Sequence, residues 1–193
     1  MKRFAVLLVM MLSSLTAWAE GALNPVEGVN YHVLGTRVST VGPIEVAEFF
    51  GYFCPHCEAL EPHLESWLKN KPDDVNFIRV PATFNRPVVL MYAKTYYALQ
   101  QIGAVDKVHA AIFAAIHKHG QKLDSQEKME AFLATQGIDV NAYKEAMDSF
   151  EVNLKLQQAM KLAKKYAISG VPSMIVDKHY KDGENSTSQL RCN

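Results

Sequence analysis

An apolar run followed directly by two cysteines restricts the fold more than any other feature of the chain. Residues 44–50 (IEVAEFF) are apolar at almost every position, which is typical of a strand buried on both faces of a sheet. Pro55 stands where it can open a helix, and residues 56–70 have helical spacing. Residues 75–80 (VNFIRV) alternate and predict a second strand. Two strands joined through one helix form a right-handed βαβ unit.

A helical block follows this unit before the chain returns to strand. The spacing predicts helices over residues 90–102, 105–117, 125–135, 141–150 and 152–166. Residues 171–176 (VPSMIV) are strand-like, but Pro172 excludes an ordinary central-strand position and indicates a strand start or a special turn. Residues 31–34 are a candidate edge strand. The order predicts an α/β fold in which the inserted helices form a second, smaller lobe.

The N-terminal segment has the pattern of a secretory signal peptide. Residues 1–19 (MKRFAVLLVMMLSSLTAWA) combine a short positive region, an apolar run and a small-x-small cleavage site. The alternative is an uncleaved N-terminal anchor, for which the apolar run is short. Cleavage predicts an exported protein in a compartment where disulfides persist.

The composition excludes several classes of protein. The chain has 20 Lys and Arg residues against 20 Asp and Glu residues, so it has no global field that would attract nucleic acid. Hydrophobic residues make up 49% of the chain, which excludes wholesale disorder. Three cysteines are too few for a small protein held together by disulfides.

The sequence Cys54-Pro55-His56-Cys57 carries the chemistry. Two cysteines separated by two residues, after a buried strand and at the start of a helix, are typical of a redox motif. The helix N-terminus favours negative charge, so the pKa of the Cys54 thiol is expected well below its free value of about 8.5. His56 can donate a hydrogen bond or a positive charge to the same sulfur, and Pro55 fixes the turn. Cys57 is then the less exposed, resolving thiol.

The residues between the cysteines indicate the direction of the reaction. Stabilising the thiolate stabilises the reduced form, which makes the disulfide a stronger oxidant. We therefore expect a donor of disulfides. The alternatives are a zinc site, which lacks a second Cys/His pair with suitable spacing, and a structural disulfide, whose short loop would stabilise little.

Glu48 is a carboxylate inside the apolar strand, six residues before Cys54. A buried acid has a raised pKa and can accept or pass protons, so Glu48 is a candidate to take the proton from Cys57 when that thiol attacks a mixed disulfide. The alternative is an edge glutamate that points to solvent. Glu45 is expected to be the solvated one of the two.

Val171-Pro172 is the third candidate. A proline that begins a strand beside a dithiol suggests a cis peptide bond, and such a turn would leave backbone groups free to pair with a substrate chain. The alternative is an ordinary trans proline in a loop. We expect Val171 and Pro172 to bind substrate.

The motifs EVAEFFGYFCPHCEALEP and KLAKKYAISGVPSMIVD, with the helical block between them, resemble the DsbA-type periplasmic thiol:disulfide oxidoreductases. The resemblance runs from about residue 31 to 177. It implies a thioredoxin fold with an inserted helical domain. It also implies that Cys54 is the exposed nucleophile, Cys57 its buried partner, Glu48 the buried acid and Pro172 a cis proline. The redox-active Cys54–Cys57 disulfide would then be the only reactive group, with no separate cofactor and no metal.

The same resemblance implies partners and a division of the chain. Substrates would be unfolded exported polypeptides held in an apolar groove, and a DsbB-like membrane quinone reductase would reoxidise a monomeric periplasmic enzyme. The divisions are a signal peptide (1–19), the first part of the thioredoxin fold (20–84), the helical insertion (85–160), the returning part of the thioredoxin fold (161–177) and an atypical tail (178–193).

The tail departs from the family pattern. Family members continue with another strand and a long helix, whereas residues 178–193 (KHYKDGENSTSQLRCN) are polar and too few for a strand plus a covering helix. A frameshifted or truncated reading frame, or a natural shortened variant, would explain this, and one face of the sheet would lack its cover. Cys192 is expected to be a free thiol or to pair between molecules, with no part in catalysis.

The function predicted from the sequence is the donation of the Cys54–Cys57 disulfide to newly exported proteins. One alternative is a disulfide isomerase or reductase of similar fold. Another is a truncated, poorly active form that acts only as a binder, including a metal binder.

Overall fold

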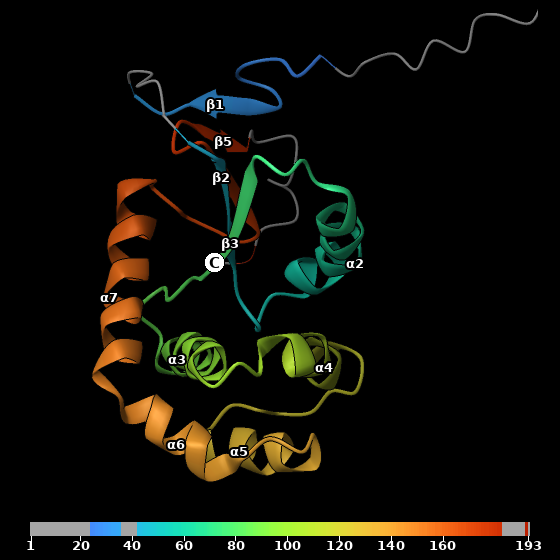
Figure 1. The fold of residues 1–193 in the computed structure, drawn as a ribbon, viewed down its shortest axis with the longest axis vertical. Helices are drawn as coiled ribbons and strands as arrows, with labels where there is room; N and C mark the ends of the chain where they lie inside the picture. Colours follow the sequence, from blue (N-terminus) through green and yellow to red (C-terminus); the bar gives the residue numbers. More distant parts are fainter. Residues whose placement is uncertain (1–23, 36–41, 183–191, 193) are drawn as a thin grey trace, which may run out of the picture.

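The computed structural model describes residues 24–35, 42–182 and 192. Its sheet has the strand order β1-β5-β4-β2-β3 (Figure 1). The strands are β1 (Tyr31–Val33), β2 (Ile44–Phe50), β3 (Val75–Pro81), β4 (Ser173–Val176) and β5 (Tyr180–Asp182). β2 and β3 are parallel and the other neighbours are antiparallel, so the predicted βαβ unit is confirmed.

Six helices surround this sheet within the described residues. They are α2 (Pro55–Asn70), α3 (Pro87–Gln101), α4 (Val105–His117), α5 (Gln126–Thr135), α6 (Val140–Asp148) and α7 (Phe150–Lys165). Figure 1 shows α2 and α7 on opposite sides of the sheet, with α3 to α6 gathered below it. The helical block is therefore an insertion between β3 and β4, as predicted.

Helix boundaries differ from the prediction where a local residue decides them. α3 begins at Pro87 because proline fits the first turn of a helix, where its missing N–H has no partner to lose. α6 ends at Asp148 because Ser149 caps α7, its Oγ accepting a hydrogen bond from the Val152 N–H at 3.2 Å.

β2 is an inner strand of the sheet, with β3 on one side and β4 on the other. Residues 46–50 of this strand are all buried, which explains why its sequence is nearly continuous in apolar residues. Phe50 and Tyr52 at its end pack edge-on against each other and contact Phe113 of α4. The aromatic contacts fix the end of β2, and hence the start of α2, against the inserted helices.

The end of the chain contains a short strand that the sequence did not indicate. Residues 178–193 were expected to be too few and too polar for a strand plus a covering helix, and among their described residues Tyr180–Asp182 form β5. β5 lies between β4 and β1 and pairs with both, because the backbone hydrogen bonds that hold it do not require apolar side chains. β4 begins at Ser173 rather than at Val171.

Two further points concern the N-terminal segment and helices that could cross a membrane. The predicted signal peptide, residues 1–19, lies outside the described residues. Within residues 24–35, 42–182 and 192, no helix has the length and apolar character needed to cross a membrane.

Candidate redox-active site

The cysteine motif lies where the central strand ends and α2 begins. Cys54 is the N-cap residue of α2, with an extended backbone, and Pro55 is the first helical residue. The Cys54 carbonyl accepts hydrogen bonds from the N–H groups of Cys57 at 3.1 Å and Glu58 at 3.3 Å. The Cys54 side chain makes no capping hydrogen bond. The sulfur of Cys54 thus stands at the positive end of the helix, as the sequence predicted.

The disulfide in the structure joins Cys54 to Cys192, and Cys57 is a buried free thiol. The Cα atoms of Cys54 and Cys192 are 5.6 Å apart. The expectation that Cys192 would be free or pair between molecules is therefore wrong, because the chain returns it to the site. Cys54 was expected to be exposed, but here it is fully buried because its sulfur is bonded to Cys192.

The Val171-Pro172 peptide bond is cis, as predicted, and it lies beside this disulfide. The Val171 carbonyl oxygen is 3.2 Å from the Cys54 sulfur. The Val171 N–H donates to the Cys192 carbonyl at 2.9 Å, and the Cys192 N–H donates to the Val171 carbonyl at 2.8 Å. Both backbone groups of Val171 therefore pair with the backbone of Cys192.

Glu48 is the buried carboxylate that the sequence suggested, and the alternative of a solvent-facing glutamate is excluded. Burial, with a contribution from Glu61, raises the pKa of Glu48 to about 8. Its Oε2 forms an ion pair with Nε of Arg79 at 3.2 Å, but neither carboxylate oxygen of Glu48 has a hydrogen-bond partner among the described residues. Glu45 is only partly buried, in line with its predicted solvation.

Burial also raises the pKa of the Cys57 thiol, and the Glu48 and Glu61 carboxylates add to this shift. A buried thiol near a carboxylate is stable as the neutral form, and it needs a nearby base to lose its proton. Glu48 is thus electrostatically coupled to Cys57, as its predicted role requires.

A chain of buried polar groups extends from Glu48 into the helical insertion. Arg79 Nη2 donates to Glu61 Oε2 at 2.8 Å, and Glu61 Oε1 lies 3.1 Å from His109 Nε2. The Tyr52 hydroxyl is 2.8 Å from His109 Nδ1. The hydrogen bonds to His109 and Arg79 hold the pKa of Glu61 below its ordinary value despite burial. The Arg79 guanidinium therefore forms ion pairs with two carboxylates. Of these, Glu61 has the more hydrogen bonds.

The family model of the DSBA-like thioredoxin domain matches residues 45–192 of this sequence. The chain belongs to this family. It is 39% identical over 184 residues to the thiol:disulfide interchange protein DsbA of Pseudomonas syringae pv. tomato, covering 94% of this chain and 86% of that protein. It is 43% identical over 165 residues to the DsbA of Azotobacter vinelandii, covering 83% and 77%.

Solved structures agree with this assignment. The crystal structure of Pseudomonas aeruginosa DsbA has a TM-score of 0.76 at 38% identity, covering 83% of this chain and 84% of that one. The DsbA of Xylella fastidiosa has a TM-score of 0.73 at 32% identity, covering 82% and 87%. The predicted thioredoxin fold with an inserted helical domain is confirmed.

Of the buried polar chain, only Glu48 was predicted from the sequence. Glu61 offers a signal in hindsight, because it shares the buried face of α2 with Cys57 and Leu64, at spacings of four and three residues. A carboxylate on an otherwise apolar helix face needs a buried partner. Arg79, Tyr52 and His109 offer no comparable signal, since only the fold brings them together.

His56 is partly buried and makes no hydrogen bond with the residues that the structure describes. Its predicted donation to the Cys54 sulfur stays a prediction for the states in which Cys54 is not bonded to Cys192. No group of three or more His, Cys, Asp or Glu residues suited to a metal ion occurs within the described part of the chain.

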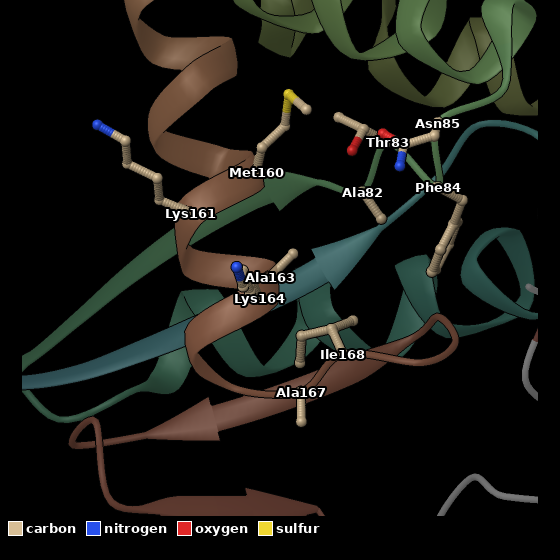
Figure 2. A pocket seen from close by; sticks show the side chains of 10 residues that line it. All are labelled: Ala82, Thr83, Phe84, Asn85, Met160, Lys161, Ala163, Lys164, Ala167 and Ile168. Atoms are coloured by element: carbon tan, nitrogen blue, oxygen red, sulfur yellow. The ribbon is translucent and has the colours of Figure 1, made fainter.

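A pocket of about 490 Å³ lies next to the site, between α7 and the connection that follows β3 (Figure 2). Phe84 and Ile168 contribute apolar surface, and Lys161 and Lys164 of α7 also line it. The ring of Phe84 contacts that of Phe53, the residue before Cys54. The pocket is thus connected to the cysteine motif through one aromatic pair.

Proposed function

We propose that this protein is a thiol:disulfide oxidoreductase that donates a Cys54–Cys57 disulfide to other proteins. The observation that carries the proposal is Cys54 at the N-terminus of α2, beside a cis proline, in a chain of the DSBA-like family. Cys57 lies one helical turn further, buried, and within reach for an intramolecular disulfide. The reactive group is this disulfide, so the reaction requires no cofactor.

The reaction proceeds by two thiol–disulfide exchanges. A substrate thiolate attacks the Cys54 sulfur, the Cys54–Cys57 bond breaks, and Cys57 leaves as a thiolate that takes up a proton. A second substrate thiolate then attacks the substrate sulfur of the mixed disulfide and releases Cys54 as a thiolate. The substrate dithiol loses two electrons and the enzyme gains them.

Because the site is buried, a nearby protein group must exchange the proton of Cys57. Glu48, with a pKa of about 8, is mostly protonated at neutral pH and can give its proton to the leaving Cys57 thiolate. When the enzyme is reoxidised, Cys57 must lose a proton again, and Glu48 as carboxylate can accept it. Pro55 and His56 act on Cys54 instead: Pro55 fixes the turn and His56 offers a donor to the thiolate.

Substrate is held by main-chain and apolar contacts. Val171, next to the cis bond of Pro172, offers an N–H and a carbonyl to an extended polypeptide, and the cysteine of that polypeptide then faces Cys54. The pocket beside Phe84 and Ile168 provides apolar surface for neighbouring side chains of an unfolded substrate (Figure 2). Such contacts select extended, thiol-bearing chains rather than a particular sequence.

The cellular setting is part of the proposal. Cleavage of residues 1–19 would deliver a monomeric enzyme to the periplasm, where newly exported polypeptides present free thiols. A DsbB-like membrane quinone reductase would take up the two electrons and restore the disulfide. Residues 20–84 and 161–177 would form the thioredoxin part and residues 85–160 the helical domain.

The test uses the mature chain with Cys192→Ser, so that the motif is studied alone. The oxidised protein is mixed with a reduced peptide that holds two cysteines, and peptide oxidation is followed by mass spectrometry after acid quenching. We expect one peptide disulfide per enzyme. Adding Cys54→Ser or Cys57→Ser should abolish oxidation, because a single remaining thiol holds no disulfide to donate. When the oxidised peptide is offered instead, the Cys57→Ser variant should accumulate a mixed disulfide on Cys54, because the Cys54 thiolate attacks the peptide disulfide, one peptide thiol leaves, and Cys57 is absent to resolve the product. Oxidation by the Cys54→Ser variant would disprove the mechanism.

A second assay separates donation from isomerisation. A protein with scrambled disulfides is offered to the reduced enzyme without added oxidant. Donation predicts little recovery of native pairing, while efficient recovery would favour the isomerase alternative.

A further inference from the structure

Cys192 approaches Cys54 in the manner of an extended peptide. It forms an antiparallel bridge with Val171, with hydrogen bonds of 2.9 and 2.8 Å in the two directions. Its sulfur is bonded to Cys54, 138 residues away in the sequence. A disulfide between two distant cysteines does not require their backbones to be hydrogen-bonded. The backbone pairing with Val171 is therefore a second contact, independent of the disulfide.

The same groups are needed by a substrate. Val171 has one N–H and one carbonyl directed to this side, and Cys54 has one sulfur, so Cys192 and a substrate cysteine cannot use them together. The Cys54 sulfur is fully buried when Cys192 is bonded to it. We infer that Cys192 is an internal substrate thiol that caps the active site by a reversible disulfide with Cys54. This inference rests on the proposed function, because it assigns Cys192 to the substrate position of that site.

The capping step needs no external oxidant. Starting from the Cys54–Cys57 disulfide, the Cys192 thiolate attacks the Cys54 sulfur, the Cys54–Cys192 bond forms and the Cys54–Cys57 bond breaks. Cys57 leaves as a thiolate and takes up a proton equivalent to the one that Cys192 gave up. The reverse attack, by Cys57 on Cys54, opens the site again, so the number of disulfides stays at one.

The described surroundings favour the capped form once it exists. Cys57 is buried as a neutral thiol, and burial opposes the thiolate that the opening step requires. Cys192 meanwhile keeps two backbone hydrogen bonds to Val171. A free substrate must therefore compete with a thiol of the same chain that is already in register.

The first measurement maps the disulfide in the oxidised mature protein. Free thiols are alkylated in denaturing acid, and the chain is cleaved after glutamate. Cleavage gives residues 49–58, which hold Cys54 and Cys57, and residues 185–193, which hold Cys192. We expect the two peptides cross-linked with the label on Cys57. A label on Cys192 alone, or a Cys192–Cys192 dimer, would overturn the inference.

Two variants test whether register or only tethering matters. After exchange with oxidised glutathione, which takes up the two electrons, Cys57→Ser should give a monomer without free thiols, in which Cys54 is bonded to Cys192. A Cys192→Ser, Ser188→Cys variant carries a thiol on the same tether, four residues earlier, and we expect it to cross-link to Cys54 to a smaller extent. An equal extent of cross-linking would show that tethering alone is responsible and would refute a substrate-like position.

The second measurement compares oxidation of a reduced dithiol peptide by the wild type and by Cys192→Ser. A tethered thiol has an effective concentration on the order of 1 mM, so at a peptide concentration of about 0.1 mM we expect an initial rate roughly tenfold higher for Cys192→Ser. Equal rates would overturn the cap. If neither protein oxidises the peptide, the proposed function fails, while the disulfide map still decides whether Cys192 reaches Cys54.

Discussion

Two regions of the molecule bury different kinds of side chain. The first region is the sheet together with α2, and the second is the set of inserted helices. Around β2, two carboxylates are buried, Glu48 and Glu61, with Arg79 between them. In the insertion, most of the fully buried positions are apolar, as at Ile112, Met129 and Leu133. Buried charge lowers stability unless it is paired, whereas apolar packing raises it. The buried carboxylates thus lie in the region of the cysteines, whereas apolar packing stabilises the insertion.

The two regions meet at a buried polar contact made by His109. His109 of α4 lies within 3.1 Å of Glu61 on α2 and within 2.8 Å of the Tyr52 hydroxyl. A residue of the insertion thereby interacts with a buried carboxylate of the sheet region and lowers its pKa. Substitutions in each region test whether the free energy of unfolding and the titration of the Cys54 thiol depend on that region alone.

The largest effect is expected from pH. The unfolded chain releases the Glu48 proton near pH 4.5, whereas the folded protein holds it up to about pH 8. The free energy of unfolding should therefore fall as pH rises between these values, by at most about 5 kcal/mol. Urea denaturation from pH 4 to 9 measures the slope. Glu48→Gln should flatten it, and an unchanged slope would remove Glu48 as its source.

Glu61 provides the matched control with the opposite sign. Its pKa is lowered in the folded protein, so its stabilisation is present above about pH 4.5 and is lost as pH falls below that value. Glu61→Gln should change the acid side of the same profile and leave the slope toward pH 8 in place.

Removal of Arg79 comes next. Arg79→Met leaves Glu48 and Glu61 buried without their shared cation, and we expect a loss of about 4 kcal/mol in the free energy of unfolding at pH 7. Urea denaturation measures the loss. Arg79→Lys keeps the charge and should recover part of it. A loss as small as that of a surface substitution would mean that the carboxylates relax to other partners.

Leu133→Ala tests the insertion alone. Leu133 of α5 is fully buried, and its truncation should lower the free energy of unfolding by about 3 kcal/mol. The thiolate absorbance of Cys54 should titrate at the same pH as in the parent chain, both measured with Cys192→Ser. A shifted titration would show that packing in the insertion controls the thiol, and the comparison between the two regions would fail.

The smallest effect is expected at the cap of α7. The Ser149 hydroxyl accepts from the Val152 N–H at 3.2 Å and donates to Gln101 of α3 at 2.8 Å. Ser149→Ala should lower the free energy of unfolding by about 1 kcal/mol, and Ser149→Asp should lose less because it retains the capping acceptor. Thermal unfolding of the three proteins distinguishes them. Equal losses for both variants would point to the Gln101 contact instead.

Local patterns in the sequence determined most of the framework. The apolar run of β2, the alternation of β3 and the periodicity of the helices depend on neighbours in the chain, so each could be predicted without knowledge of the fold. The cysteine motif and the cis bond at Pro172 were predicted because each is encoded by adjacent residues. The short strand β5 escaped prediction because backbone pairing, rather than an apolar pattern, holds it in the sheet.

Only the tertiary structure decided what faces the cysteines. The sequence left open whether Glu48 was buried, since an acid in a strand can point to either face, and packing settled it. Glu61 and His109 are 48 residues apart and Cys54 and Cys192 are 138 apart, and no periodic pattern encodes such pairs. By itself, the sequence determined that two cysteines stand at a strand-to-helix turn. The fold supplied the buried polar partners and the third cysteine, because a contact between distant residues exists only once the chain between them is packed.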